Sequence, residues 1–300
     1  MSATLEVVLT GTGVPHPTPG RAGPGTLVRY EDGEHRLALQ FDAGRGTVIR
    51  LAEAGSPPSR LTAMFLTHVH SDHLVDLADV AMTRWLQKQL HRCGPLQIVC
   101  AAGMAQRFAE RMFETFDDDI AVRVHHAGSE RPEIDVRTFD ASFVPHEVWR
   151  HDASEVTVTA VAVHHEPVPE AVAYRVDTPA GSVVISGDTR VCREVEELSR
   201  GADLLVHEAC RATAMRDAIA GTVFETIFSY HADSVALGAA ASRARVPHLV
   251  LTHLIPSPGN DADEQGFVDD VRSGGYDGPV TVGRDLMTFR VSKGTRTATT

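Results

Sequence analysis

The sequence lacks three features that would each indicate a different class of protein. No apolar run reaches the about 18–20 residues that a membrane-spanning helix needs. Residues 1–9 carry neither a basic segment nor a cleavage site of the kind that marks a signal peptide. The four cysteines are Cys93, Cys100, Cys192 and Cys210. They form no CxxC pair and no dense framework, which favours reduced thiols over disulfides. Together these absences predict a cytoplasmic protein without a membrane partner.

Basic residues are also scarce. The 300-residue chain has 28 Lys and Arg against 40 Asp and Glu, a formal net charge of −12, and no dense basic run. Binding to a nucleic-acid backbone depends on Lys and Arg that neutralise phosphates, and a net negative field repels long polyanions. The charge balance therefore disfavours a nucleic-acid partner and favours a small substrate.

Strand and helix patterns intermix along the whole chain, and 43% of the residues are hydrophobic. No linker or internal repeat divides it, so we expect a single α/β domain over residues 1–291, with helices outside the sheets, and a disordered tail over 292–300. Ser71 or Asp72 is expected to cap the helix over 74–90. The other expected helices cover 47–54, 104–116, 234–244 and 263–272. Strands are expected at 5–10, 26–30, 36–41, 61–67, 97–101, 156–163, 171–176, 182–186, 203–206, 248–252, 280–282 and 286–291.

Sixteen histidines are present, and they are densest in the run THVHSDH at residues 67–73. On an extended segment residues i and i+2 point to the same side, so His68 and His70 can bind one ion together. Asp72 and His73 fall in the first turn of the following helix and face another direction. One short segment can therefore serve two ions. Imidazole and carboxylate ligands without thiolate suit Zn²⁺, with Mn²⁺, Fe²⁺ or Co²⁺ as alternatives.

This HxHxDH run resembles the signature of the metallo-β-lactamase superfamily. Further matches resemble one branch of it, which contains ribonuclease Z and arylsulfatase-like enzymes. The resemblance implies an αββα four-layer sandwich of two mixed sheets with helices on the outer faces. The matching segments span most of the chain and are residues 9–13, 165–168, 173–175, SGDT at 186–189, HEA at 207–209, His231, LTH at 251–253 and 283–287.

The resemblance also implies two divalent metal ions, with Asp188 between them. His164 competes with His165 because neighbours on a strand face opposite ways, and the proline two residues after His165 favours the latter. Asp188 alone would equally suit a turn after a strand. The implied ligands of the first ion are His68, His70 and His165, and those of the second are Asp72, His73 and His253.

A mechanism follows from the same resemblance. Two ions would hold a hydroxide nucleophile, and His231 would protonate the leaving group while Glu208 orients its ring. With Asp72 these are the expected catalytic residues. Two plainer interpretations stay open: His231 as an exposed histidine before a helix, and Glu208 as a salt-bridge partner at a strand end.

The substrate is the least determined part. We expect a metal-dependent hydrolase of a small phosphodiester, sulfate ester or lactone-like ester. A ribonuclease Z-like endonuclease that processes tRNA 3′ ends is the alternative, disfavoured by the charge and by the lack of a Gly/Pro- and Lys-rich insertion between Cys93 and His165. An iron-dependent oxidoreductase is less expected, because the HxExD pattern of diiron flavoproteins is absent.

Two further expectations concern surfaces. Residues 145–151 combine an aromatic with both signs of charge, and form either a wall of the substrate pocket or a solvated loop. Arg175 either meets an anionic substrate or pairs within its strand. Because relatives of this fold often dimerise, the resemblance also makes a homodimer one expected form of the chain.

Overall fold

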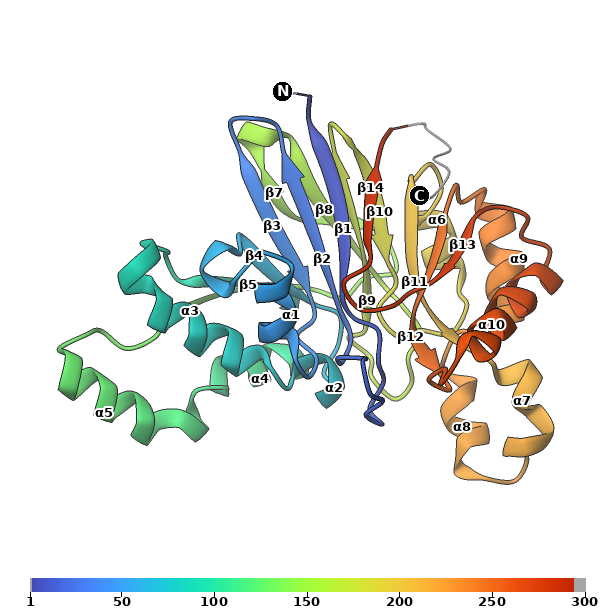
Figure 1. Ribbon diagram of the computed structural model, residues 1–300, viewed down its shortest axis with the longest axis horizontal. Helices are drawn as coiled ribbons and strands as arrows, with labels where there is room; N and C mark the ends of the chain where they lie inside the picture. Colours follow the sequence, from blue (N-terminus) through green and yellow to red (C-terminus); the bar gives the residue numbers. More distant parts are fainter. Residues whose placement is uncertain (1, 294–300) are drawn as a thin grey trace.

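A computed structural model describes residues 2–293. Two seven-stranded sheets pack face to face, and helices lie on the outer faces of both (Figure 1). The strand orders are β14-β1-β2-β3-β4-β5-β6 and β13-β12-β11-β10-β9-β8-β7. The predicted αββα sandwich is therefore confirmed. The tail expected over 292–300 lies, from residue 294 on, outside the described residues.

Both sheets are mixed. In the first, β14 to β3 pair antiparallel and β3 to β6 parallel. In the second, β10 to β13 pair parallel and β10 to β7 antiparallel. The strands of the first sheet are β1 (Thr4–Gly11), β2 (Gly25–Glu31), β3 (Arg36–Phe41), β4 (Ala63–Leu66), β5 (Leu96–Ala101), β6 (Ile134–Phe139) and β14 (Thr288–Val291). Those of the second are β7 (His146–His151), β8 (Val156–Ala162), β9 (Val172–Thr178), β10 (Gly181–Ile185), β11 (Leu204–Cys210), β12 (Leu249–Ile255) and β13 (Val280–Val282).

Helices cover the outer face of each sheet. Buried side chains of α1, α3 and α4 join one core cluster with the first sheet, and those of α6, α9 and α10 join another with the second. In Figure 1, α5 projects at one side and α7 with α8 at the other. The helices are α1 (Thr47–Glu53), α2 (Ser71–Leu74), α3 (Leu77–His91), α4 (Met104–Arg111), α5 (Asp117–Ala127), α6 (Arg193–Leu198), α7 (Ala212–Ile219), α8 (Val223–Ser229), α9 (Ser234–Ala244) and α10 (Asp261–Ser273), with 3₁₀ turns at Pro58–Arg60, Glu114–Phe116 and Asp152–Ser154. None of the helices described has the length and apolar character needed to cross a bilayer.

Strands buried on both faces explain the near-continuous apolar runs of the sequence. In β1, Leu5 and Val7 point into the core between the sheets, whereas Val8 points to the helix layer. Aromatic rings fill the centre of the sandwich. Phe41 and Phe65 stack with centroids 4.8 Å apart, and the rest of this core consists mostly of β-branched and leucine side chains.

The helix expected over 74–90 is divided in two. Asp76 separates α2 from α3, since its carboxylate accepts a hydrogen bond from Gly46 N at 2.8 Å and its own amide donates to Ala43 O at 3.0 Å. The capping prediction is wrong, because His70 occupies the N-cap position of α2 and no side chain caps it. Asp72 is unavailable as a cap because its carboxylate approaches His73 and His253 instead.

Within the segment 145–151, residues 146–151 are a strand rather than a solvated loop. They form β7, an edge strand of the second sheet, and Trp149 lies in the core between the sheets. The ring of Trp149 meets that of Phe65 edge to face, with centroids 6.0 Å apart. The sequence of this segment was ambiguous because the exposed side chains of an edge strand can be as charged as those of a loop.

Tyr174 connects the two sheets next to the histidine run. Its hydroxyl, on β9, donates to Leu66 O at the end of β4 over 2.7 Å, and both groups are buried. Tyr174→Phe leaves that carbonyl without its partner, so we expect a loss of unfolding free energy of about 1–3 kcal/mol, measured by urea denaturation. Tyr174→Ala, which also opens a cavity, should cost more. Wild-type stability in Tyr174→Phe would show that this hydrogen bond does not hold the sheets together.

Candidate metal centre

Strand ends converge at one edge of the sandwich and bring the predicted ligands together. β4 leads into His68 and His70, α2 carries Asp72 and His73, β8 leads to His165, β10 leads to Asp188, and β12 contains His253. All seven residues are buried except His70, which is partly exposed. Ligand sites at the carboxyl ends of strands are a general property of α/β sheets.

One carboxylate lies at the centre of this cluster. The Oδ2 atom of Asp188 is 3.2 Å from the Nε2 atoms of both His73 and His253. It is also 3.8 Å from Nε2 of His68 and 3.9 Å from Nε2 of His165. Asp188 therefore contacts histidines from both expected ligand groups, in agreement with a bridging position.

Donor atoms in the cluster form three overlapping groups, of which two are the expected ligand sets and the third is Asp188, His231 and His253. His68, His70, His165 and Asp188 each offer a ligand atom within 4.8 Å of the others. The second group contains Asp72, His73 and His253, and within it Asp72 Oδ2 lies 3.6 Å from His73 Nε2 and 3.4 Å from His253 Nε2. These are the two groups expected from the sequence.

The chemistry of the donor atoms fits divalent cations. Buried atoms without any hydrogen-bond partner include His68 Nε2, His73 Nε2 and Asp188 Oδ1, and such burial is costly unless the atoms are paired or bind a metal. Burial lowers the pKa values of His68, His70 and His165. These imidazoles are therefore neutral near pH 7 and keep a lone pair for coordination.

Asp42 supports the cluster from behind and was not identified from the sequence. Its Oδ2 lies 2.7 Å from Nδ1 of His73 and accepts the hydroxyl of Thr67 at 2.7 Å, while Oδ1 accepts the Thr67 amide at 2.8 Å. A carboxylate on one imidazole nitrogen fixes the ring so that the other can face a metal. The available signal was an aspartate directly after β3, followed by Ala and Gly.

Burial alone would lower the pKa of His73, but the charges of Asp188, Asp42 and Asp72 outweigh it and raise the pKa well above its ordinary value. For Asp188 the balance is reversed. Burial would raise the pKa of its carboxyl group, and the neighbouring histidines, led by His253, hold that pKa well below the usual range. The site thus favours ionised carboxylates beside imidazole rings.

Two glycines permit the backbone contact behind α2. A Cβ atom on Gly44 would lie 2.4 Å from the carbonyl oxygen of Asp72, and one on Gly23 would lie 2.9 Å from the same atom. Any side chain at either position would push α2 away. The loops before β2 and after β3 therefore lie against α2 and set the position of Asp72.

His231 and Glu208 form a buried pair beside the cluster. The Nδ1 atom of His231 lies 2.9 and 3.0 Å from the two carboxylate oxygens of Glu208, and its ring stacks on that of His253 with centroids 5.5 Å apart. Glu208 in turn accepts the Thr189 amide at 2.7 Å. Burial alone would lower the pKa of His231, but Glu208 outweighs it and raises the pKa to about 9. His231 is therefore not a surface histidine.

The open alternatives are decided by position. His165 belongs to the cluster, and its Nδ1–H donates to Tyr230 O at 3.3 Å. His164 lies outside it, with Nε2 3.3 Å from Glu194. Arg175 pairs with Asp177 at 2.9 Å on its own strand and donates to the Leu198 and Arg200 carbonyls at the end of α6, so it is engaged away from the cluster.

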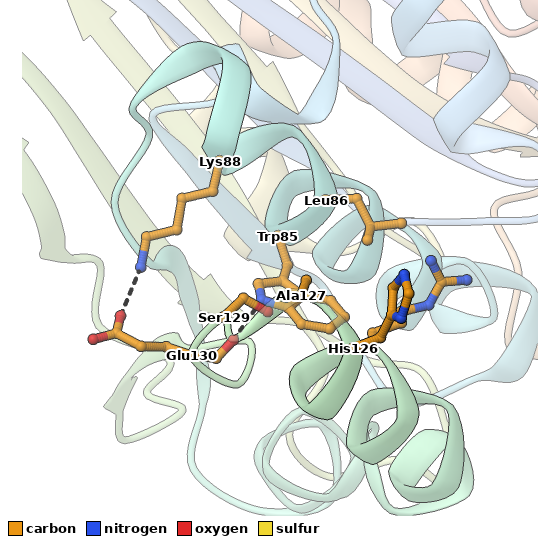
Figure 2. A pocket seen from close by; sticks show the side chains of 8 residues that line it. Trp85, Leu86, Lys88, His126, Ala127, Ser129 and Glu130 are labelled. Carbon is orange, nitrogen blue, oxygen red and sulfur yellow. Dashed lines mark hydrogen bonds and ion pairs between the residues drawn. The ribbon is translucent and has the colours of Figure 1, made fainter.

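A separate surface cavity of about 360 Å³ lies between α3 and α5 (Figure 2). None of its lining residues belongs to the histidine cluster. Lys88 pairs there with Glu130 at 3.3 Å, and the Trp85 indole donates to Glu130 O at 2.9 Å. These pairings stabilise the helix layer, and the reactive chemistry of the described residues lies in the cluster.

Known proteins resemble the chain in both sequence and structure. A model of the β-lactamase superfamily domain matches residues 40–254. Ribonuclease Z of Mycobacterium bovis is 36% identical over 289 residues, which cover 96% of this chain and 98% of that protein. Ribonuclease Z of Mycobacterium sp. strain KMS is 39% identical over 266 residues, which cover 86% and 88%.

Solved structures with the same fold include the short form of human tRNase Z and the metallo-β-lactamase fold protein YhfI of Bacillus subtilis. The former superposes with a TM-score of 0.68 at 21% identity and covers 95% of this chain and 99% of that one. The latter has a TM-score of 0.71 at 19% identity and covers 96% and 99%. The chain belongs to the β-lactamase superfamily of metal-dependent hydrolases and, within it, to the family of the ribonuclease Z proteins.

Proposed function

We propose that this chain is a ribonuclease of the ribonuclease Z type, which hydrolyses a phosphodiester bond in RNA at a centre of two divalent metal ions. One observation carries the proposal: a complete cluster around Asp188, with the His231–Glu208 pair beside it, occurs in a chain that aligns with Ribonuclease Z relatives over 96% of its length. RNA cleavage replaces the small ester that the charge alone favoured.

We infer that the two ligand groups hold one ion each and that Asp188 contacts both ions. Nitrogen and oxygen donors rich in imidazole suit Zn²⁺, with Mn²⁺ or Fe²⁺ as alternatives. Bound divalent cations would supply positive charge to a phosphoryl oxygen and a nucleophilic water at neutral pH. Because both sheets contribute ligands, we propose that residues 1–291 act as one unit.

The remaining chemistry belongs to His231. Glu208 occupies its Nδ1, so Nε2 is the nitrogen left to hold a proton for the departing ribose oxygen. The Glu208 carboxylate raises the pKa of His231 to about 9 and so favours the protonated ring, which suits a general acid. Glu208 is the positioning residue, because it fixes the ring and stabilises its charged form.

A second candidate function keeps the same chemistry with a small phosphodiester. The net charge of −12 supports it, since long polyanions are repelled. So does the segment between Cys93 and His165, which forms β5 to β8 with α4 and α5 and contains no Gly/Pro- and Lys-rich insertion. The choice between the two substrates is open to direct measurement.

A substrate panel on metal-analysed protein tests the proposal. We expect site-specific cleavage of a precursor tRNA with a 3′ extension, which is lost after chelation and restored by zinc. Bis-p-nitrophenyl phosphate should be a weaker substrate, and an aryl sulfate and an acyl lactone weaker still. Rapid hydrolysis of a small ester together with intact precursor RNA would overturn the proposed substrate and favour the second candidate.

The general-acid assignment predicts a separation between metal binding and turnover. His231→Ala should retain the metal content of the wild type and lower kcat by about 10²–10⁴-fold, and Glu208→Gln should lower kcat in the same direction. Glu130→Gln is the matched control, because Glu130 pairs with Lys88 at a surface cavity that shares no residue with the cluster, and its kcat should be unchanged. Metal analysis and steady-state kinetics give the answer. Normal turnover in His231→Ala would exclude the role.

A further inference from the structure

Phe143 and His164 form an aromatic pair at the residue that precedes His165 in the chain. Their rings stack with centroids 5.1 Å apart and an angle of 25° between the planes. His164 directly precedes His165, a member of the cluster. Phe143 is nevertheless 57% exposed. His164 therefore supports the ring of Phe143 while a large part of that ring faces solvent.

Polar contacts hold the supporting ring in place. The Nε2 atom of His164 lies 3.3 Å from the Glu194 carboxylate, and Nδ1 lies 3.4 Å from Nη2 of Arg190. The Arg190 amide also donates to His164 O at 3.0 Å. In the chain, His165 directly follows His164, and Asp188 lies two residues before Arg190. The aromatic pair is thus linked along the chain to the segments that carry His165 and Asp188.

The segment that carries Phe143 is fixed as well. Ser142 O accepts the Ala162 amide at 2.7 Å, which ties the segment to the end of β8, and Ser142 Oγ accepts the Val144 amide at 3.0 Å. Val144 is 72% exposed. Single exposed apolar residues are ordinary, but here an exposed phenyl ring is held in a defined orientation next to a hydrolytic centre.

We propose that Phe143 stacks on a nucleobase of the RNA substrate, at a nucleotide next to the bond that is cleaved. The inference rests on the proposed function and names the group that this part of the site recognises. Unstacked RNA bases bind to aromatic side chains through their flat faces. Phe143 offers such a face, and His164 holds it from behind.

The charges around the pair favour a base over a phosphate as the group recognised. Arg190 lies 3.4 Å from Glu166, and His164 lies 3.3 Å from Glu194. The Arg190 guanidinium and the His164 imidazole are therefore each paired with a carboxylate, so the attraction for a phosphate is largely cancelled. Stacking on the neutral ring is the interaction that remains.

A combination of protein and RNA changes isolates this contact. Phe143→Ala should lower kcat/KM for precursor RNA by about 5- to 150-fold. The loss should shrink to less than about twofold on RNA with an abasic ribose at one of the two nucleotides that flank the cleaved bond. Phe143→Trp should restore activity because it keeps the flat face. Val144→Ala, at an even more exposed neighbour, is the matched control and should behave as wild type.

RNA binding separates this inference from the proposed function. In a His231→Ala background, Phe143→Ala should weaken binding of a labelled single-stranded RNA by the same factor, measured by fluorescence anisotropy. Base-dependent binding without any cleavage by the wild type would contradict the ribonuclease proposal and support the stacking contact. An equal loss on abasic RNA, unchanged binding, or a change only in oligomeric state by Phe143→Ala would overturn the stacking contact.

Discussion

The structure depends on one buried carboxylate. Asp188 lies within 3.9 Å of four imidazole nitrogens that come from both sheets, and a buried carboxylate of this kind is stable only when it is paired or binds a cation. The strands around it therefore have to end at one edge of the sandwich. Candidate ligands from both sheets, and His231 of the His231–Glu208 pair, offer donor atoms within 4.8 Å of it.

Supporting groups turn this arrangement into a defined site. Asp42 holds one nitrogen of His73, and Tyr174 links the second sheet to the carbonyl just before the histidine run. Gly44 lets the loop after β3 lie against α2. Supporting contacts of this kind fix the direction in which a ligand points, and site geometry is lost when they are loose. The site is thus as much a product of packing as of the ligands themselves.

The fold and the candidate ligands could be expected from the sequence because short motifs carry them. His68 to His73 lie in one hexapeptide, and the later ligands follow strands with clear apolar patterns. Asp42 escaped prediction because nothing in the sequence shows that β3 and β4 are neighbours. The break at Asp76 and the edge strand β7 depend on contacts with distant segments, Ala43 and Gly46 in one case and β8 in the other. The periodicity of apolar residues predicts only local structure, and contacts between distant segments can override that prediction.

Anomalous diffraction at the zinc edge from crystals of the metal-loaded protein tests the central claim most directly. The account predicts two peaks, one among His68, His70 and His165 and the other among Asp72, His73 and His253, each within coordination distance of Asp188. His165→Ala should remove the first peak and His164→Ala should leave both. A single peak, or peaks away from Asp188, would contradict a dinuclear centre built on this carboxylate.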